Sequence, residues 1–599
     1  MPRWICTPTT RRRRAASSAA TRSARSCGWR PPSTSRPAMR RRTSPRPRRR
    51  SASWRRSLIS CCWTTNCSPD YSRRPRRPRP PNSRSHHMTN WDAATLQIVW
   101  QRLISVADEM AAVLLRTAFS SVVRESNDLA CAVLTADGDL LVEYGRSVPV
   151  FTGTVAGTVR NMITEFGVEN IGPGDVIATN DPWFGNTHLP DFTAATPVFR
   201  DGAVVAWVAS ICHVSDIGGT SEGAFAQDIY EEGFCLPPVK LVDAGAPNAL
   251  VRKILARNVR VPDQVLGDID ALIAANSLGV RRITAMIAGD DGLDISEAAA
   301  QIARVTEKAM RDSIRQIPDG SYTAQVELDG FEEPKQITVT IEVTGDELVV
   351  DYEGTSSQST YGINSGSPTM GYTRYGMACL LAPDVPNNEG ALRPITIRVP
   401  KGSLLNPSHT AAVSANFPAH AIPAVLSRAL LGPLPSRVAA AAGTPFWVVG
   451  VRGSNEKGPF ASLLCFNGGQ GASEGQNGYA TLSTPSNVSN TPIEVVENQV
   501  PLLVGSKRIV RGSGGAGQWS GGEGQEIEMT SIHEDPLDII FLTERIAHAA
   551  PGLAGGGDGA TGILRVDGVD VEHPKGRLTL ASGSSILLRT PGGGGYGAA

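Results

Sequence analysis

Residues 180–219 read NDPWFGNTHLPDFTAATPVFRDGAVVAWVASICHVSDIGG and hold two compact groups of side chains that bind metals in proteins. His188 and Asp191 lie in THLPD, and His213 and Asp216 lie in HVSDIGG. Two apolar runs, TPVF and AVVAWVAS, separate the groups and are joined by the turn sequence RDG. We therefore predict a β-hairpin whose open end brings the two groups face to face.

Imidazole and carboxylate ligands suit a borderline or hard divalent ion, and three protein ligands leave a coordination position for water or substrate. The alternative is a pair of histidines that are merely hydrogen-bonded near strand ends. HxxD is a short pattern that occurs in many unrelated chains, so the spacing alone leaves both interpretations open.

Composition divides the 599 residues into two unlike parts. Residues 1–87 hold 24 Arg, no Lys and one acidic residue, Asp70, whereas residues 88–599 hold 34 basic and 56 acidic residues. The first part is rich in Arg, Ser and Pro and has no periodic apolar pattern, so we expect it to be disordered. Different origins for the two parts would explain this break in composition.

Three interpretations of residues 1–87 stay open: a nucleic-acid-binding arm, a transit peptide, and a start codon assigned upstream of the true start at Met88. We favour the last, because out-of-register reading of GC-rich codons gives much Arg, Pro and Ser without Lys. On that interpretation no nucleic-acid partner is expected.

Cysteine usage and hydropathy suggest the compartment. Cys131, Cys212, Cys235, Cys379 and Cys465 are scattered over residues 88–599 without a CxxC pair. This usage is typical of a reducing compartment, and we expect a cytoplasmic protein. No apolar run reaches about 18 residues without charge, so no membrane span is expected.

Hydrophobic periodicity predicts both helices and strands. Helical spacing occurs over 92–120, 153–166, 249–256, 265–287, 296–314, 367–381 and 421–442. Strand patterns occur over 129–144 with a turn at Asp137-Gly138, over 175–179, and in AQVELDG and ITVTIEVTGDELVVDYEG after residue 320.

Residues 446–599 are strand-like and rich in Gly, with loops NGGQGASEGQNG, RGSGGAGQWSGGEG, GLAGGGDG and TPGGGGYG. Because no P-loop or dinucleotide-binding motif accompanies them, tight turns and bulges are favoured over phosphate-binding loops. We predict a multi-domain mixed α/β (α+β) fold. Its parts are an α/β metal-site region at 88–320, an α/β middle region at 321–445 and a Gly-rich, β-dominated region at 446–599.

A series of ordered motifs resembles the hydantoinase B/5-oxoprolinase family. The motifs are NDPWFGNTHLPD, ICHVSDIGG, DYEGTSSQSTYGIN, SANFPAH, SNTPIEVVE, SGGAGQWSGGEG, LTERIAHAAPGLAGGG and TPGGGGYG. The match runs from about residue 89 to the C-terminus. The family includes the B-type subunits of N-methylhydantoinases, the C-terminal half of 5-oxoprolinase, and alpha subunits of acetone and acetophenone carboxylases.

The resemblance implies that His188, Asp191 and His213 hold a divalent ion, manganese or zinc. Asp216 is then expected to orient a ligand histidine. Asp216 and Glu222 are the candidates for a general base.

Asn180 and Asp181 open the same motif. They are expected either to line the same cleft or to cap the turn before Pro182.

The resemblance also implies a larger A-type partner that binds ATP and phosphorylates the carbonyl or enol oxygen of a small-molecule substrate. We expect this chain to be the B-type subunit of an ATP-dependent cyclic amidase, in a hetero-oligomer that opens a hydantoin or 5-oxoproline-like lactam. Two alternatives stay open: the alpha subunit of an ATP-dependent ketone carboxylase, and a non-catalytic subunit that stabilises its partner.

Overall fold

The computed structural model describes residues 91–599, apart from 221–222, 290–292, 414–416 and 457. All described residues belong to one compact unit. The predictions made for residues 1–87 and for Glu222 therefore fall outside the described residues.

A seven-stranded antiparallel sheet has the strand order β2-β1-β5-β4-β3-β6-β7. Its strands are Leu129–Thr135 (β1), Leu140–Glu143 (β2), Val176–Thr179 (β3), Asp191–Arg200 (β4), Ala203–His213 (β5), Val239–Asp243 (β6) and Ala246–Pro247 (β7). The predicted hairpin is formed by β4 and β5. Its turn contains Asp201 and Gly202, with φ angles of 51° and 80° that these residue types tolerate in tight turns.

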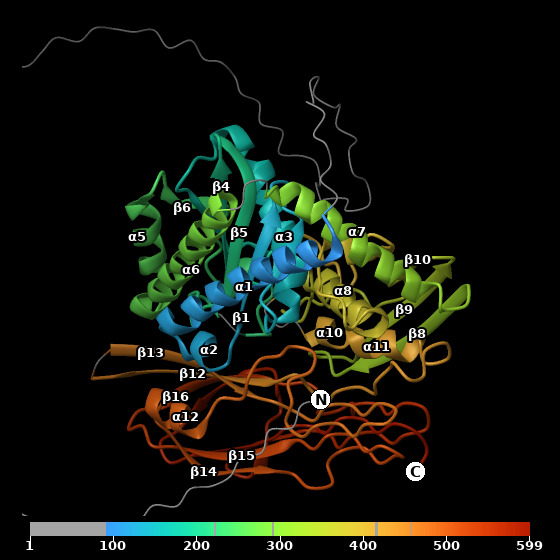
Figure 1. The fold of residues 1–599 in the computed structure, drawn as a ribbon. Coiled ribbons are helices and arrows are strands. Elements are labelled where there is room, and N and C mark those ends of the chain that lie inside the picture. Colours follow the sequence, from blue (N-terminus) through green and yellow to red (C-terminus); the bar gives the residue numbers. More distant parts are fainter. Residues whose placement is uncertain (1–90, 221–222, 290–292, 414–416, 457) are drawn as a thin grey trace, which may run out of the picture. The chain divides into compact units, whose positions relative to one another are not determined.

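Helices cover both faces of this sheet (Figure 1). They are α1 (Ala93–Thr117) and α6 (Pro262–Gly289) on one face and α3 (Pro149–Phe166) on the other. Side chains of β1 alternate between the two cores: Cys131 and Val133 join the core with α1 and α6, whereas Ala132 and Leu134 join the core with α3. Because helices bury both faces, the central strands are apolar along most of their length.

Among the described helices, α6 alone is long and apolar enough to cross a membrane by length and composition. Its polar residues contact the protein itself. Asn276 donates a 2.9 Å hydrogen bond to the carbonyl oxygen of Ala194 on β4. Buried Asp268 accepts the amide hydrogens of Phe119 and Ser120, at 2.7 and 3.0 Å. These contacts are those of a core helix packed on a sheet.

A second sheet has four strands in the order β11-β10-β9-β8. They are Gly320–Leu328 (β8), Lys335–Thr344 (β9), Glu347–Asp351 (β10) and Ile395–Arg398 (β11). The predicted hairpin turns at Gly345, which has a φ of 61°, and β11 then pairs in parallel with β10.

One helix prediction for the middle region is wrong at its C-terminal end. Periodicity predicts a helix over 421–442, but α11 spans Ile422–Ala429. Gly432, Pro433 and Pro435 follow, and Pro cannot continue a helix because it lacks the amide hydrogen. The remaining helices are α2 (Ser121–Arg124), α4 (Ile229–Glu232), α5 (Ala249–Asn258), α7 (Ile295–Ile314), α8 (Pro368–Leu381), α9 (Glu389–Leu392), α10 (Phe417–His420) and α12 (Ile493–Gln499).

The C-terminal part contains two sheets that share one apolar core. The first has the order β13-β12-β16-β19 and the second β14-β15-β20-β17-β18. Their strands are Trp447–Asn455 (β12), Gly458–Phe466 (β13), Leu502–Ile509 (β14), Gln525–Ser531 (β15), Leu537–Leu542 (β16), Ile563–Val566 (β17), Val569–Asp570 (β18), Arg577–Leu580 (β19) and Ser585–Arg589 (β20). Trp447 and Phe541 of one sheet and Ile527 and Leu588 of the other are fully buried in this core.

The Gly-rich segments are more than tight turns, because they pack backbone against backbone outside the strands. Main-chain hydrogen bonds run from Gly515 to Gly593, from Gly593 to Gly522 and from Gly522 to Gln470, at 2.7–2.9 Å. A Cβ atom on Gly593 would lie 2.1 Å from the carbonyl oxygen of Gln470. The residues at such contacts must therefore be Gly. The predicted mixed α/β fold with a Gly-rich, β-dominated C-terminal part is confirmed.

Replacing Gly593 with Ala should destabilise the protein by about 1–3 kcal/mol, because the new methyl group overlaps a carbonyl oxygen that belongs to the backbone. Gly432→Ala is the matched control, since a Cβ atom there has no neighbour within 4 Å. Urea denaturation of both variants measures the effect. Equal midpoints for the two variants would contradict the packing argument.

Candidate metal centre

The open end of the β4–β5 hairpin brings the two predicted groups together. In the antiparallel register, Asp191 at the start of β4 lies opposite His213 at the end of β5. His188 lies three residues earlier, in a tight turn closed by a 3.0 Å hydrogen bond from the Asp191 amide to the His188 carbonyl oxygen. The strand ends and this turn therefore fix all three residues relative to one another.

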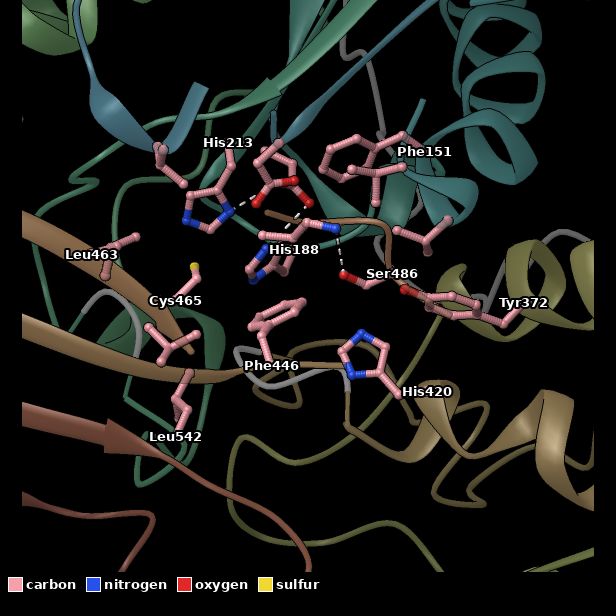
Figure 2. A pocket seen from close by; sticks show the side chains of 17 residues that line it. Phe151, His188, His213, Tyr372, His420, Phe446, Leu463, Cys465, Ser486 and Leu542 are labelled. Atoms are coloured by element: carbon pink, nitrogen blue, oxygen red, sulfur yellow. Dashed lines mark hydrogen bonds and ion pairs between the residues drawn. The ribbon is translucent and has the colours of Figure 1, made fainter. Parts of the chain in front are cut away.

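Asp191 contacts both imidazole rings. His188 Nε2 lies 3.2 Å from Asp191 Oδ2, and His213 Nδ1 lies 3.1 Å from Asp191 Oδ1 (Figure 2). The ring centroids of the two histidines are 5.0 Å apart. All three residues are buried, and Asp191 has no exposed surface. A carboxylate so placed needs compensation for its charge, which the two imidazoles can provide.

Hydroxyl and amide groups hold Asp191 in place. The Thr187 hydroxyl donates to Asp191 Oδ2, and the Asn186 side chain donates to the main-chain oxygen of Asp191. The Thr193 hydroxyl in turn donates to Asn186 Oδ1 at 2.8 Å. Burial by itself would raise the pKa of Asp191, but the charges and hydrogen bonds of His188 and His213 bring it below its usual value. Asp191 is therefore an ionised, acceptor-rich group.

The three side chains fit a divalent metal ion. Their ligand atoms all lie within 4.8 Å of one another. Metal–ligand bonds of about 2.0–2.2 Å place neighbouring donor atoms roughly 3–3.5 Å apart, close to the two His–Asp distances. Two imidazoles and a carboxylate are also a donor set that borderline divalent ions accept. The same contacts serve as hydrogen bonds without an ion.

A cavity of about 60 Å³ opens beside the cluster. Roughly 10–15 Å³ is enough for one water molecule, so several waters or a small polar group can be accommodated. Most of its wall is apolar, and side chains from distant parts of the chain complete it, as Figure 2 shows. These include Asp128, Phe151, Tyr372, His420, Phe446, Cys465 and Ser486.

His420, at the end of α10, lies across this cavity from the cluster. Its ring packs edge-on against Tyr372 and Phe446, with centroid separations of 5.2 and 5.5 Å. Burial, and secondarily the charge of His188, lowers the pKa of His420 to about 3. Its imidazole is therefore neutral at physiological pH, with one nitrogen able to donate and one able to accept a hydrogen bond.

Sequence analysis did not single out His420, Tyr372 or Asp128 as site residues. His420 is the last residue of SANFPAH, one of the motifs that resemble the family. A histidine within a shared motif is a usable signal of a site. Asp128 and Tyr372 lie outside the quoted motifs and carry no comparable signal.

Asn180 holds three chain segments together. Its side-chain amide donates to the carbonyl oxygens of Leu189 and Phe234, at 2.7 and 2.8 Å. Its Oδ1 accepts the amide hydrogen of Leu236 at 2.6 Å. Asn180 thus positions the segment before His188, and it does not belong to the wall of the cavity.

Asp181 is the N-cap of the short 3-10 helix η2 (Pro182–Phe184), where it accepts the Trp183 amide hydrogen at 2.9 Å. This is the capping role considered above. Burial raises the pKa of Asp181, and its side chain also contacts Cys235. Asp181 likewise lies outside the wall of the cavity.

Asp216 pairs with Arg260 and does not belong to the three-residue cluster. Arg260 donates to Asp216 through its main-chain amide and through Nη1, the latter at 2.6 Å. Nη2 of Arg260 donates to the carbonyl oxygen of Gly219 at 2.5 Å. Asp216 is fully buried, and both of its carboxylate oxygens are engaged in these contacts. The structure thus joins His188, Asp191 and His213 but leaves Asp216 in a separate ion pair.

Known proteins share this chain's sequence and fold. A protein of Pseudomonas sp. (strain NS671), named as the B-type component of a D-/L-hydantoinase, is 34% identical over 540 residues, covering 84% of this chain and 90% of the relative. The ATP-dependent caprolactamase from Pseudomonas jessenii is 25% identical, with a TM-score of 0.77 over 85% of this chain and 92% of its own. A nucleotide-free acetone carboxylase is 18% identical, with a TM-score of 0.78 over 84% of this chain and 75% of its own, and so shares the fold.

The model of one protein family also matches almost all of the described residues. Its description is hydantoinase B/oxoprolinase, and the match covers residues 92–599. The motif THLPD and the strand end at His213, which build the metal-binding geometry described above, both lie within it. The chain therefore belongs to the hydantoinase B/oxoprolinase family.

Proposed function

We propose that this chain is the B-type subunit of an ATP-dependent cyclic amidase that opens a hydantoin or a 5-oxoproline-like lactam. The buried His188–Asp191–His213 cluster, facing a small and mostly apolar cavity, is the observation that carries the proposal. The names of the hydantoinase and caprolactamase relatives, both enzymes of cyclic amides, support the substrate class. The likeness to acetone carboxylase supports the fold alone.

In this proposal ATP is bound by an A-type partner, because the sequence has no nucleotide-binding motif of its own. The partner transfers the γ-phosphoryl group to the amide oxygen of the lactam. This converts a poor electrophile into an activated one. Water then attacks the ring carbon, and the carbon–nitrogen bond breaks to give an amine and an acyl phosphate. A second water hydrolyses the acyl phosphate to a carboxylate and inorganic phosphate. The two chains then act as a hetero-oligomer on a common intermediate.

His188, Asp191 and His213 would hold the divalent ion, manganese or zinc. Such an ion supplies Lewis acidity for a carbonyl oxygen and lowers the pKa of a coordinated water. Asp191 keeps the two imidazole rings oriented through its contacts at 3.2 and 3.1 Å. The neutral ring of His420 lines the same cavity and can orient a water there through a hydrogen bond.

Asp216 was considered above as a general base and as an orienting acid. Its ion pair with Arg260 supports a role in stability instead, since both carboxylate oxygens already accept hydrogen bonds. Glu222 remains a proposed base with no structural description.

Purified chain should contain about one divalent metal ion, and His188→Ala or His213→Ala should remove most of it, because each substitution deletes one of three ligands. His573→Ala is the matched control, since His573 is exposed and far from the cluster in sequence. Elemental analysis after gel filtration gives the metal content. Metal-free wild-type chain in a fully active complex would contradict the assignment.

With the A-type partner present, ATP consumption should depend on a lactam, and His188→Ala should lower the rate at least about 100-fold through loss of a ligand at the reacting centre. His573→Ala should leave the rate unchanged. Release of ADP is measured with the lactam and, separately, with a ketone plus bicarbonate. Dependence on the ketone and bicarbonate would identify a carboxylase, and unchanged turnover in His188→Ala would identify a non-catalytic subunit.

Asp216→Asn should lower the free energy of unfolding by about 1–3 kcal/mol, because Arg260 loses its charge-assisted hydrogen bonds. Arg260→Met should have a similar effect, and the double variant should cost less than the sum of the two. Urea denaturation measures all three. Wild-type stability of Asp216→Asn together with lost turnover would return Asp216 to the catalytic machinery.

A further inference from the structure

A second cavity, of about 90 Å³, lies on the other side of His420. His420 lines both this cavity and the one beside the His188–Asp191–His213 cluster. Small residues of α11 and of the segment 439–445 form much of its wall, and Arg545 also lines it. The two cavities are therefore neighbours with one shared side chain between them.

Arg545 is a buried cation within this wall. The residue is 4% exposed, and its Nη1 donates to the carbonyl oxygens of Glu327 and Ala549, at 3.0 and 3.3 Å. Among the described residues no ion pair within 4.0 Å is found for its guanidinium, and the carboxylates of Glu544, Asp329 and Asp558 act on its charge from farther away. Charged side chains are rarely buried without a counter-ion, because desolvating the charge is costly.

The nearby carboxylates are engaged by other groups. Glu544 lines the same cavity, but its Oε2 pairs with Lys575 Nζ at 3.0 Å and its Oε1 accepts the Asp329 amide hydrogen at 2.7 Å. Asp329 accepts the amide hydrogens of Ile546 and His548, at 2.6 and 2.8 Å. These contacts fix the two carboxylates in place, and Arg545 lines the cavity beside them.

The chemistry of Arg545 indicates what that space accepts. A guanidinium presents parallel N–H groups that match the two oxygens of a carboxylate or a phosphoryl group. Ser427 and Thr484 add hydroxyl groups to a wall that otherwise consists mostly of Ala, Pro and Gly. A small oxyanion would gain charge-assisted hydrogen bonds there and would pair directly with the buried guanidinium.

We propose that this second cavity binds an anionic oxygen group, a carboxylate or a phosphoryl group, of the molecule whose reacting carbonyl lies at the His188–Asp191–His213 cluster. The inference rests on the proposed function for the location of the reacting carbonyl. The anion site itself rests on Arg545 and the cavity alone. Its ligand is thus a substrate or activated intermediate in which a negatively charged group lies at some distance from the ring carbon that water attacks.

Isothermal titration of the chelator-treated, metal-free chain with sodium acetate and with inorganic phosphate tests the site directly. Saturable binding of at least one anion is expected, and Arg545→Met should weaken it at least tenfold. Arg428→Met, an exposed arginine on α11, is the matched control and should bind within twofold of wild type. Stronger binding of acetate would identify a carboxylate site, and stronger binding of phosphate a phosphoryl site.

Ala424→Leu provides a second variant, because it fills the cavity from α11 without changing a charge. It should weaken anion binding at least tenfold even if Arg545→Met fails to fold. Absence of saturable binding in wild type, or unchanged binding in Ala424→Leu, would overturn the proposal. His188→Ala should retain anion binding while it loses lactam-dependent ATP consumption. Unchanged ATP consumption in His188→Ala together with intact anion binding would contradict the proposed function and leave this site standing.

Discussion

The carboxylate of Asp191, buried between two imidazoles, is the constraint around which the first sheet is organised. With no exposed surface, its charge must be met inside the protein, and His188 and His213 are the groups that meet it. The contact with His213 requires the observed register of β4 and β5. A slip of one residue would turn Asp191 to the opposite face and leave its charge uncompensated. The contact between Asp191 and His213 therefore sets both the register of the hairpin and the geometry of the site.

The cavity beside the cluster depends on contacts between regions that are far apart in sequence. The hairpin supplies His188 and His213, α10 supplies His420, and β12 and β13 contribute Val448 and Cys465. Helices on both faces of the first sheet hold the hairpin rigid, and the C-terminal core holds β12 and β13. The apolar walls they provide exclude bulk water, which strengthens electrostatic interactions at the cluster.

The Gly-rich segments contribute to both cavities through the backbone. Gly594 donates a 2.8 Å hydrogen bond to the carbonyl oxygen of Ala441, and Ala441 donates to Pro551 at 3.2 Å. These bonds fix the segment that lines the second cavity and leads to Phe446 in the first. Only Gly allows backbones to approach so closely, so the unusual composition serves the placement of these walls.

The sequence by itself determined the local features: the β4–β5 hairpin, most helices, and the His188, Asp191 and His213 triplet that the hairpin brings together. Periodicity and turn residues encode such features because they act over a few residues. Only the tertiary structure decided that Asp216 pairs with Arg260 and that Asn180 forms hydrogen bonds that join three segments. It also decided that His420 and Arg545 line neighbouring cavities. Those contacts join residues tens to hundreds of positions apart, and they arise from the packing of separate cores, which local patterns do not encode.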